Sequence, residues 1–309
     1  MKRNIIVSTA VALALSLPAF AQGTDALSFS RQGRNPVTLG LGGAGTSTTF
    51  DAAYSAFSNS SVLPFMEKKF AAGVSYNLWA PSVSRTNAIN VGVAYKFSPR
   101  FAMTLAYAHD SSLPYDVLDY DGVVTGSFTP SDNLVGLGLA FGLGDRLGLG
   151  VNVRYAAEKL SSDYSNRGVA GDVFLTFAVN ENLRFSAGAA NIGTPVTSYD
   201  KKKYAQPASV CISGAYGLGF GEAFRLDFAL DANYYFSKNF SLAAGGQFGW
   251  NDMVFARIGY RFATQNAVLP SFLGIGIGGK FKGITIDLSY MTASKALGNT
   301  LAVGLGYSF

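Results

Sequence analysis

The residues of this chain that could carry out catalysis are few. The single histidine, His109, is followed by Asp110, Ser111 and Ser112, which are the residue types of a Ser–His–carboxylate hydrolase. A catalytic triad needs side chains that converge in space, and neighbours at the end of one strand do not converge. The single histidine and the single cysteine, Cys211, also argue against a zinc site built on several such ligands. We therefore expect no catalytic residues, no bound metal and no enzymatic activity.

Two glycine-rich segments match phosphate-binding motifs without their structural context. Residues 40–45, GLGGAG, fit GxGxxG, but no βαβ unit surrounds them. Residues 274–280, GIGIGGK, fit GxxxxGK, but Phe281 stands where the motif requires Ser or Thr. The second segment also alternates like a strand. We expect no nucleotide cofactor.

The composition narrows the class of protein. Of 309 residues, 49% are hydrophobic, 14% are aromatic and only 14% are charged, against about 25% charged in a typical soluble domain. A chain so rich in aromatic residues is not disordered, and a net charge of +5 is too small to indicate a nucleic-acid partner. After residue 21, no apolar run reaches the length of about 20 residues that a transmembrane helix needs. An all-β protein with a large apolar exterior remains.

The first 21 residues have the pattern of an export signal. The basic segment MKRN precedes the apolar segment IIVSTAVALALSLP, and Ala19 and Ala21 form a small-x-small cleavage motif before Gln22. A membrane anchor is the alternative, but the apolar run is short and ends at Pro18. We expect cleavage after Ala21 and entry of the mature chain into the bacterial envelope.

Most of the remaining chain alternates large apolar residues with small ones. In residues 301–309, Val303, Leu305, Tyr307 and Phe309 fall on one face, and glycine, alanine and serine fall on the other. The polar face of a soluble sandwich would favour Lys, Glu and Thr instead. Large residues outside and small residues inside suit a closed barrel that meets lipid, and only a closed barrel allows a β-protein to span a membrane.

Fourteen segments show this alternation, and each is about 10 to 13 residues long, which suffices for a tilted strand to cross a bilayer. We expect strands at residues 69–79, 86–97, 100–109, 132–143, 146–157, 169–179, 182–191, 207–217, 223–235, 239–250, 252–262, 271–281, 283–292 and 300–309. Short connections alternate with long polar ones, as in bacterial outer-membrane barrels. The short turn at 236–238 falls on the side of the long loops, and a missed or split strand would explain it.

The last strand and the strand ends carry many aromatic residues. We interpret Val303, Leu305, Tyr307 and Phe309 as a signal for the barrel-assembly machinery, since an alternating strand here ends on an aromatic residue. An ordinary strand that stops at phenylalanine is the alternative. Aromatic residues near other strand ends, Trp79 among them, are expected at the membrane interfaces.

The segment before the first strand does not alternate, and we expect a plug inside the barrel. The predicted division is therefore 1–21 signal peptide, 22–68 plug and 69–309 barrel. Asp51 is expected to cap a short helix, AAYSAF. A glycine cluster indicates close backbone approach or unusual dihedral angles, and it consists of Gly40, Gly42, Gly43 and Gly45.

The plug segment resembles the N-terminal hatch of the PorV/PorQ family of Bacteroidetes outer-membrane proteins. The resemblance lies in a basic residue followed by Asn35 and Pro36, the LGLGGAG segment at 39–45 and FDAAYSAFSNSSVLPF at 50–65. The segment SNSS stands where the family usually has Asn-Pro-Ala. The NIG stretch at 191–193 and MVFARIGYRF at 253–262 are similar to barrel motifs of the same family.

The resemblance implies a fourteen-stranded, FadL-like barrel in the bacterial outer membrane. Members of the family act in type IX secretion, so the expected partners are secretion components and cargo proteins, besides outer-membrane lipid and the barrel-assembly machinery. The alternative function is a FadL-type channel for small hydrophobic compounds. A lipid-modifying enzyme ranks third.

Charged residues on the small-residue faces of the strands are expected to point into the barrel. They either line a path for a solute or pair with one another and with the plug, because buried polar groups need partners. These residues are Arg154, Asp172, Arg184, Arg225, Asp227, Asp231, Arg257, Arg261 and Asp287.

Overall fold

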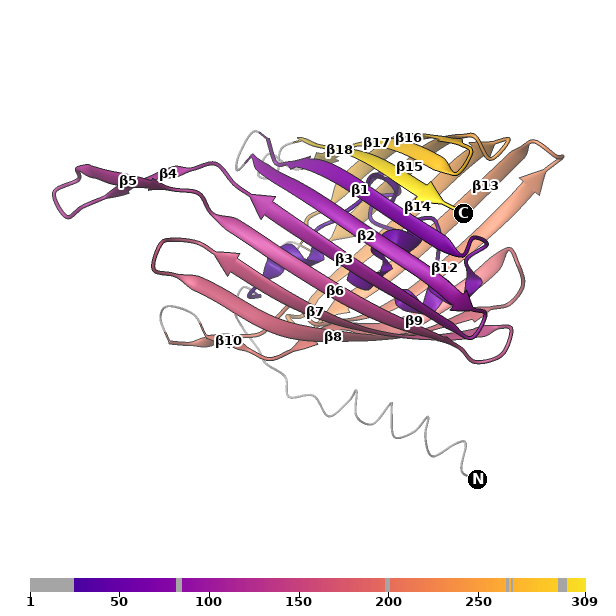
Figure 1. The fold of residues 1–309 in the computed structure, drawn as a ribbon, viewed down its shortest axis with the longest axis horizontal. Coiled ribbons are helices and arrows are strands. Elements are labelled where there is room, and N and C mark those ends of the chain that lie inside the picture. The colour runs from indigo at the N-terminus through magenta and orange to yellow at the C-terminus, as the bar shows by residue number, and fades with distance from the viewer. Residues whose placement is uncertain (1–24, 82–84, 198–200, 265–266, 268, 294–298) are drawn as a thin grey trace, which may run out of the picture.

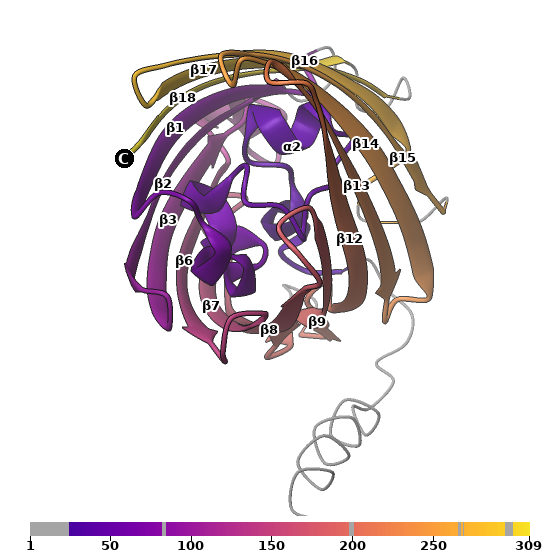
Figure 2. The same cartoon turned by 90° about the vertical axis from the view of Figure 1, so that its right-hand side faces the viewer.

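Fourteen antiparallel strands close into one barrel, in which the first strand pairs with the last (Figures 1 and 2). The computed structural model of the chain describes residues 25–81, 85–197, 201–264, 267, 269–293 and 299–309. The predicted signal peptide and its cleavage residues, Ala19, Ala21 and Gln22, lie outside the described residues. The barrel strands are β1 (Phe70–Trp79), β2 (Thr86–Ser98), β3 (Phe101–Ser111), β6 (Ser131–Gly142), β7 (Leu147–Lys159), β8 (Ser165–Ala178), β9 (Leu183–Gly193), β12 (Ser209–Phe220), β13 (Phe224–Tyr235), β14 (Asn239–Trp250), β15 (Val254–Ala263), β16 (Phe272–Phe281), β17 (Ile284–Ala293) and β18 (Asn299–Ser308).

The predicted strand count is confirmed. The turn at 236–238 joins β13 directly to β14, so the suspicion of a missed or split strand there was wrong. Two small hairpins were not predicted from the sequence, namely β4 (Tyr115–Leu118) with β5 (Val124–Phe128), and β10 (Val196–Thr197) with β11 (Lys203–Tyr204). The hairpin of β4 and β5 projects beyond the barrel at the end opposite the C-terminus (Figure 1).

The two faces of each strand differ as the alternation predicts. In β18, Val303, Leu305 and Tyr307 are 41%, 51% and 46% exposed, whereas Ala302 is fully buried. Such an apolar outer band is what a lipid bilayer requires of a barrel. The prediction for Trp79 was wrong. This residue was expected at a membrane interface but lies buried inside the barrel. It falls on the inward face of β1 together with Ser75 and Asn77.

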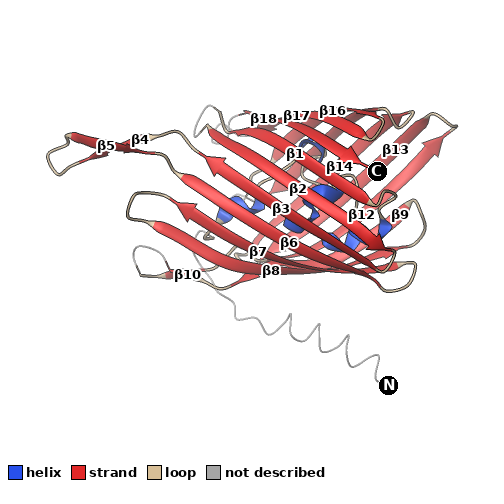
Figure 3. Cartoon of the chain, in the orientation of Figure 1, coloured by secondary structure: helices blue, strands red, loops and turns tan. Residues whose placement is uncertain are grey.

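No helix among the described residues is long and apolar enough to cross a membrane. The helices are short, and all of them precede β1. Figures 2 and 3 show that they lie inside the barrel, and we use the name plug for residues 25–68. The helices of the plug are η1 (Ser28–Arg31), α2 (Pro36–Gly40), η2 (Ala52–Phe57) and η3 (Ser60–Phe65).

The first turns of these helices follow from local sequence. Asn35 caps α2, since its side chain accepts a hydrogen bond from the Thr38 amide at 2.8 Å, and Pro36 occupies the first turn. Asp51 precedes η2 but its side chain makes no capping hydrogen bond, which corrects the predicted role. The Asp51 carboxylate is engaged instead by the side-chain amide of Asn35, so it ties the two helical parts of the plug together.

Glycines on the inward faces let the plug backbone touch the barrel wall. A Cβ on Gly259 would lie 2.0 Å from the carbonyl carbon of Leu41, and one on Gly274 would lie 2.0 Å from the Leu39 carbonyl oxygen. Gly42, between these contacts, has a φ of +69° and faces the β15 backbone. The glycine-rich composition of the strands therefore makes room for a plug that rests directly on the sheet.

Candidate functional site: a cavity between plug and barrel wall

The plug leaves two spaces in the lumen. The first, which we call the inner cavity, has a volume of about 150 Å³ and lies between the plug and the barrel wall. The second, which we call the vestibule, has a volume of about 710 Å³ and opens at the barrel end where the short turns lie. Asn35, Thr48, Asp51 and Tyr54 line both spaces. These four plug residues therefore form the partition between the inner cavity and the vestibule.

One side of the inner cavity is apolar and largely aromatic. Trp79, Phe272 and Leu39 belong to one packed cluster, line this side and are all buried. Phe174 of β8 also lines the cavity, but it packs in a separate cluster with Cys211, whose buried thiol is free. Trp79 of β1 and Phe272 of β16 are far apart in the sequence and meet only because the barrel closes.

Next to Phe272, the lining of the inner cavity becomes polar, and two arginines meet at one phenol. Arg261 of β15 donates from Nη2 to the Tyr235 hydroxyl at 2.8 Å and to Ser241 Oγ at 2.7 Å. Arg31 of the plug reaches the same hydroxyl at 3.5 Å, and its guanidinium lies over the Tyr235 ring, 5.4 Å from the centroid. Arg31 also contacts Asn233 Oδ1 at 3.4 Å.

Asp231 also lines the inner cavity, and both oxygens of its carboxylate accept hydrogen bonds from the plug or from β12. Its Oδ2 accepts hydrogen bonds from the amides of Gly45 and Thr46 at 3.2 and 3.1 Å and from Thr46 Oγ1 at 2.6 Å. Its Oδ1 accepts from Ser213 Oγ at 2.6 Å. The glycine-rich loop of the plug thus uses its backbone amides to hold a carboxylate of the barrel wall.

Other buried arginines are neutralised by carboxylates. Arg34 of the plug pairs with Asp110 of β3 at 2.6 Å, and Arg257 of β15 pairs with Asp287 of β17 at 2.6 Å. Arg154 of β7 pairs with Asp172 of β8.

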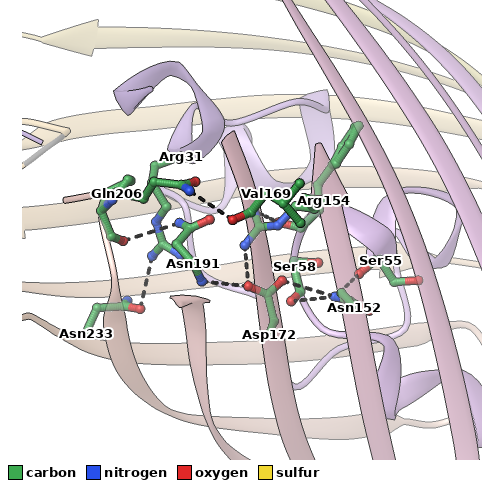
Figure 4. A network of polar contacts seen from close by, with 12 residues as sticks. Arg31, Ser55, Ser58, Asn152, Arg154, Val169, Asp172, Asn191, Gln206 and Asn233 are labelled. Atoms are coloured by element: carbon green, nitrogen blue, oxygen red, sulfur yellow. Dashed lines mark hydrogen bonds and ion pairs between the residues drawn. The ribbon is translucent and has the colours of Figure 1, made fainter. Parts of the chain in front are cut away.

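The pair of Arg154 and Asp172 belongs to a wider network at the contact with the plug (Figure 4). Asp172 Oδ1 also accepts from the Asn191 amide at 2.7 Å, at an irregularity in the pairing of β8 with β9. Asn152 donates to the carbonyl oxygens of Ser55 and Ser58, both at 3.2 Å. Barrel side chains therefore satisfy the backbone of η2 and hold it against the wall.

The remaining predicted lumen charges lie at the vestibule. Arg225 pairs with Asp227 at 2.7 Å, with the Arg225 side chain 49% exposed and that of Asp227 only 8% exposed. Arg184 lines the same space. All nine predicted charges sit on inward faces, but they divide among plug contacts, inner cavity and vestibule instead of following one path.

The partition contains a titratable group whose charge is disfavoured. Burial raises the pKa of the Asp51 carboxyl well above its ordinary value of 3.8, and the neighbouring Asp287 carboxylate adds to the rise. The amide of Asn35 and the positive charge of Arg257 oppose this shift. A protonated Asp51 would still hold Asn35, so the partition does not depend on a negative charge.

The predicted absence of a triad at His109 has a geometric reason. His109 lies on the outer face of β3, where its Nδ1 is 3.0 Å from Asn133 Oδ1, whereas Asp110 faces the lumen and pairs with Arg34. Sequence reasoning missed Arg31, Arg34 and Tyr235. Both arginines precede the glycine-rich motif, and their position before Asn35 is the one available signal.

The residues of the predicted assembly signal, Val303, Leu305, Tyr307 and Phe309, all project outward. The Phe309 ring stacks on Phe70 of β1 at 5.0 Å, so the chain end lies against the first strand. Their recognition by the assembly machinery stays a prediction.

No protein-family model matches the chain, and no curated protein matches its sequence. Solved structures, in contrast, match it over nearly its whole length. They include the toluene transporter TbuX of Ralstonia pickettii (TM-score 0.62, 13% identity, 91% of this chain and 100% of that one), the toluene transporter TodX of Pseudomonas putida (TM-score 0.63, 13% identity, 90% and 99%) and a FadL homologue of Pseudomonas aeruginosa (TM-score 0.57, 11% identity, 89% and 98%). The similarity shows that the chain has the fold of a FadL-like barrel, and identities this low show the fold alone.

Proposed function

We propose that this chain, a FadL-like barrel of the bacterial outer membrane, is a non-enzymatic channel that admits small hydrophobic, aromatic compounds. The observation that carries the proposal is the inner cavity, whose aromatic side is enclosed between plug and barrel wall. Small-molecule sites combine an apolar surface with placed polar groups, and this cavity has its aromatic side beside polar side chains. The similar transporters of toluene support the same class of compound.

The two tryptophans of the chain provide a direct test. Trp79 lines the inner cavity, whereas Trp250 is 47% exposed on the outer face of β14. In the purified barrel in detergent, bromobenzene is expected to quench Trp79 fluorescence saturably in a Trp250→Phe variant. The matched control, Trp79→Phe, reports only the dissolved quencher around Trp250 and should show a linear response. Equal, non-saturating quenching in both variants would contradict a hydrophobic site in the lumen.

The role in type IX secretion that the PorV/PorQ resemblance implies is a second candidate. The projecting hairpin of β4 and β5 favours it, because this hairpin offers exposed side chains at the end of the barrel away from the short turns. Co-purification with secreted proteins that carry a type IX cargo domain, lost when residues 115–128 are replaced by a short Gly-Ser linker, would support export. Equal recovery with and without the hairpin would count against it.

A further inference from the structure

The inner cavity carries more positive charge than its surroundings neutralise. Within the described part of the chain, neither Arg31 nor Arg261 forms an ion pair with a carboxylate. Arg261 is only 4% exposed. A buried cation without a counter-charge is unfavourable, so its retention calls for an anion that the chain itself does not provide.

The other charges around the cavity do not supply that anion. Asp231 already accepts four hydrogen bonds from the plug and from Ser213. Asp51 is bound to Asn35, and the third arginine of the cavity, Arg34, has its own partner in Asp110. Asp25 and Asp172 attract Arg31 electrostatically without forming an ion pair with it. The excess charge therefore rests mainly on Arg261, which shares the Tyr235 hydroxyl with Arg31.

The guanidinium of Arg261 has a free edge beside an aromatic ring. Its Nη2 is used by Tyr235 and Ser241, but its buried Nε has no hydrogen-bond partner. A Cβ placed on Gly43 would lie 3.5 Å from Arg261 Nη1 and 3.4 Å from the tip of the Phe272 ring. Arg261 and Phe272 are also partners across β15 and β16. Arg261 and Phe272 thus border the same space.

The size of the space limits the ligand. A cavity of about 150 Å³ is comparable to engineered protein cavities that accept a single benzene ring. A planar guanidinium presents parallel N–H donors that match the two oxygens of a carboxylate. A ligand that satisfies both features has one ring and one carboxylate.

We propose that the inner cavity binds a monoaromatic carboxylate, with the carboxylate on Arg261 and Arg31 and the ring against Phe272 and Trp79. This inference rests on the proposed function and narrows its substrate class. It differs from a hydrocarbon site in requiring a negative charge on the ligand. Entry of such an anion into the lumen would replace the missing counter-charge of the two arginines.

The test compares 4-bromobenzoate with bromobenzene in the Trp250→Phe background at neutral pH. We expect both probes to quench Trp79 saturably, with 4-bromobenzoate binding at least ten times more tightly. In the same background, Arg261→Met should lower the affinity for 4-bromobenzoate at least tenfold and leave the affinity for bromobenzene nearly unchanged. Arg31→Gln, at a less buried position, should also lower the affinity for 4-bromobenzoate. Arg225→Met, in the vestibule, is the matched control and should change neither affinity.

The outcomes separate this inference from the proposed function. Equal affinities for bromobenzene and 4-bromobenzoate, or an affinity for 4-bromobenzoate that neither arginine variant changes, would refute the carboxylate site. Either result leaves the proposed channel for hydrophobic compounds standing. If neither probe quenches Trp79 saturably, both proposals fail. A heat-modifiable gel shift confirms that each variant is a folded barrel before binding is measured.

Discussion

Buried arginines at the contacts between plug and wall differ from the two that meet at the Tyr235 hydroxyl. At the contacts, Arg34, Arg154 and Arg257 each have a carboxylate within ion-pair distance. In the inner cavity, Arg31 and Arg261 share a phenol and have no carboxylate among the described residues. The paired arginines are structural, because each joins two elements of the fold through an ion pair. The unpaired arginines are available to a ligand, and stability measurements can separate the two kinds.

Removing one member of a structural pair is expected to have the largest effect. Arg154 and Asp172 have side chains that are 2% and 0% exposed. Arg154→Met would leave the Asp172 carboxylate buried and unpaired, and breaking such a pair costs about 3–5 kcal/mol. The temperature at which the heat-modifiable gel shift is lost should fall accordingly.

Two further variants test that explanation. The double variant Arg154→Met, Asp172→Asn removes the orphaned charge and should recover most of the loss. Arg225→Met, at an ion pair whose arginine is 49% exposed, should change stability by less than about 1 kcal/mol. A double variant as unstable as the single one would show that packing of Arg154, and not its charge, matters.

Glycines of the barrel wall test the same contact between plug and wall at the level of the backbone. In Gly259→Ala the new methyl group would meet the carbonyl group of Leu41, which belongs to the plug backbone and cannot rotate away. We expect a loss of about 1–3 kcal/mol, the range for overpacked sites, and a larger single-channel conductance if the plug is displaced. Gly219→Ala is the control, since nothing lies within 4 Å of its added Cβ in the vestibule. Equal stability of the two variants would mean that the plug backbone does not pack closely against Gly259.

The stability of the barrel should respond to pH through Asp51. Because the pKa of Asp51 is raised above 3.8 in the folded protein, the folded state holds this proton more tightly than the unfolded state. The contribution of Asp51 to stability is therefore greatest below about pH 3.8 and is lost as the pH rises through the folded pKa. Asp51→Asn should lack this loss and unfold a few degrees above the wild type at neutral pH.

The comparison that isolates Asp51 is the difference between the two unfolding curves across the pH series. That difference should be near zero in acid and grow toward neutral pH, since the amide oxygen introduced by Asp51→Asn can still accept the hydrogen bond from Asn35. A constant difference at every pH would show that Asp51 does not titrate in the folded barrel.

The barrel wall could be predicted from the sequence almost strand by strand, and the lumen could not. Alternation is a local signal, so residues such as Leu305 and Ala302 reveal their faces by their neighbours alone. The same signal correctly placed Arg154 and Arg261 inside. It does not reveal that Arg154 meets a carboxylate while Arg261 does not, because pairing across strands depends on register.

The plug illustrates the same limit. The sequence predicts Asp51 as the cap of its own helix, because a sequence shows only near neighbours. Its actual partner, Asn35, is sixteen positions away and is brought close by the turns of the glycine-rich loop. The hairpin of β4 and β5 was missed for a related reason, because its short strands carry little alternation.

The smallest effect on stability is expected at the residue with the largest effect on ligand binding. Arg261→Met removes a buried charge that has no carboxylate partner, so no opposite charge is orphaned. The loss of two hydrogen bonds is offset by relief of the desolvation cost of the guanidinium, and replacing buried charge by an apolar side chain is often neutral. We expect a change of less than about 1 kcal/mol, measured by the same gel shift, against several for Arg154→Met. A drop as large as that of Arg154→Met would place Arg261 among the structural arginines and remove the basis for distinguishing the inner cavity from the rest of the lumen.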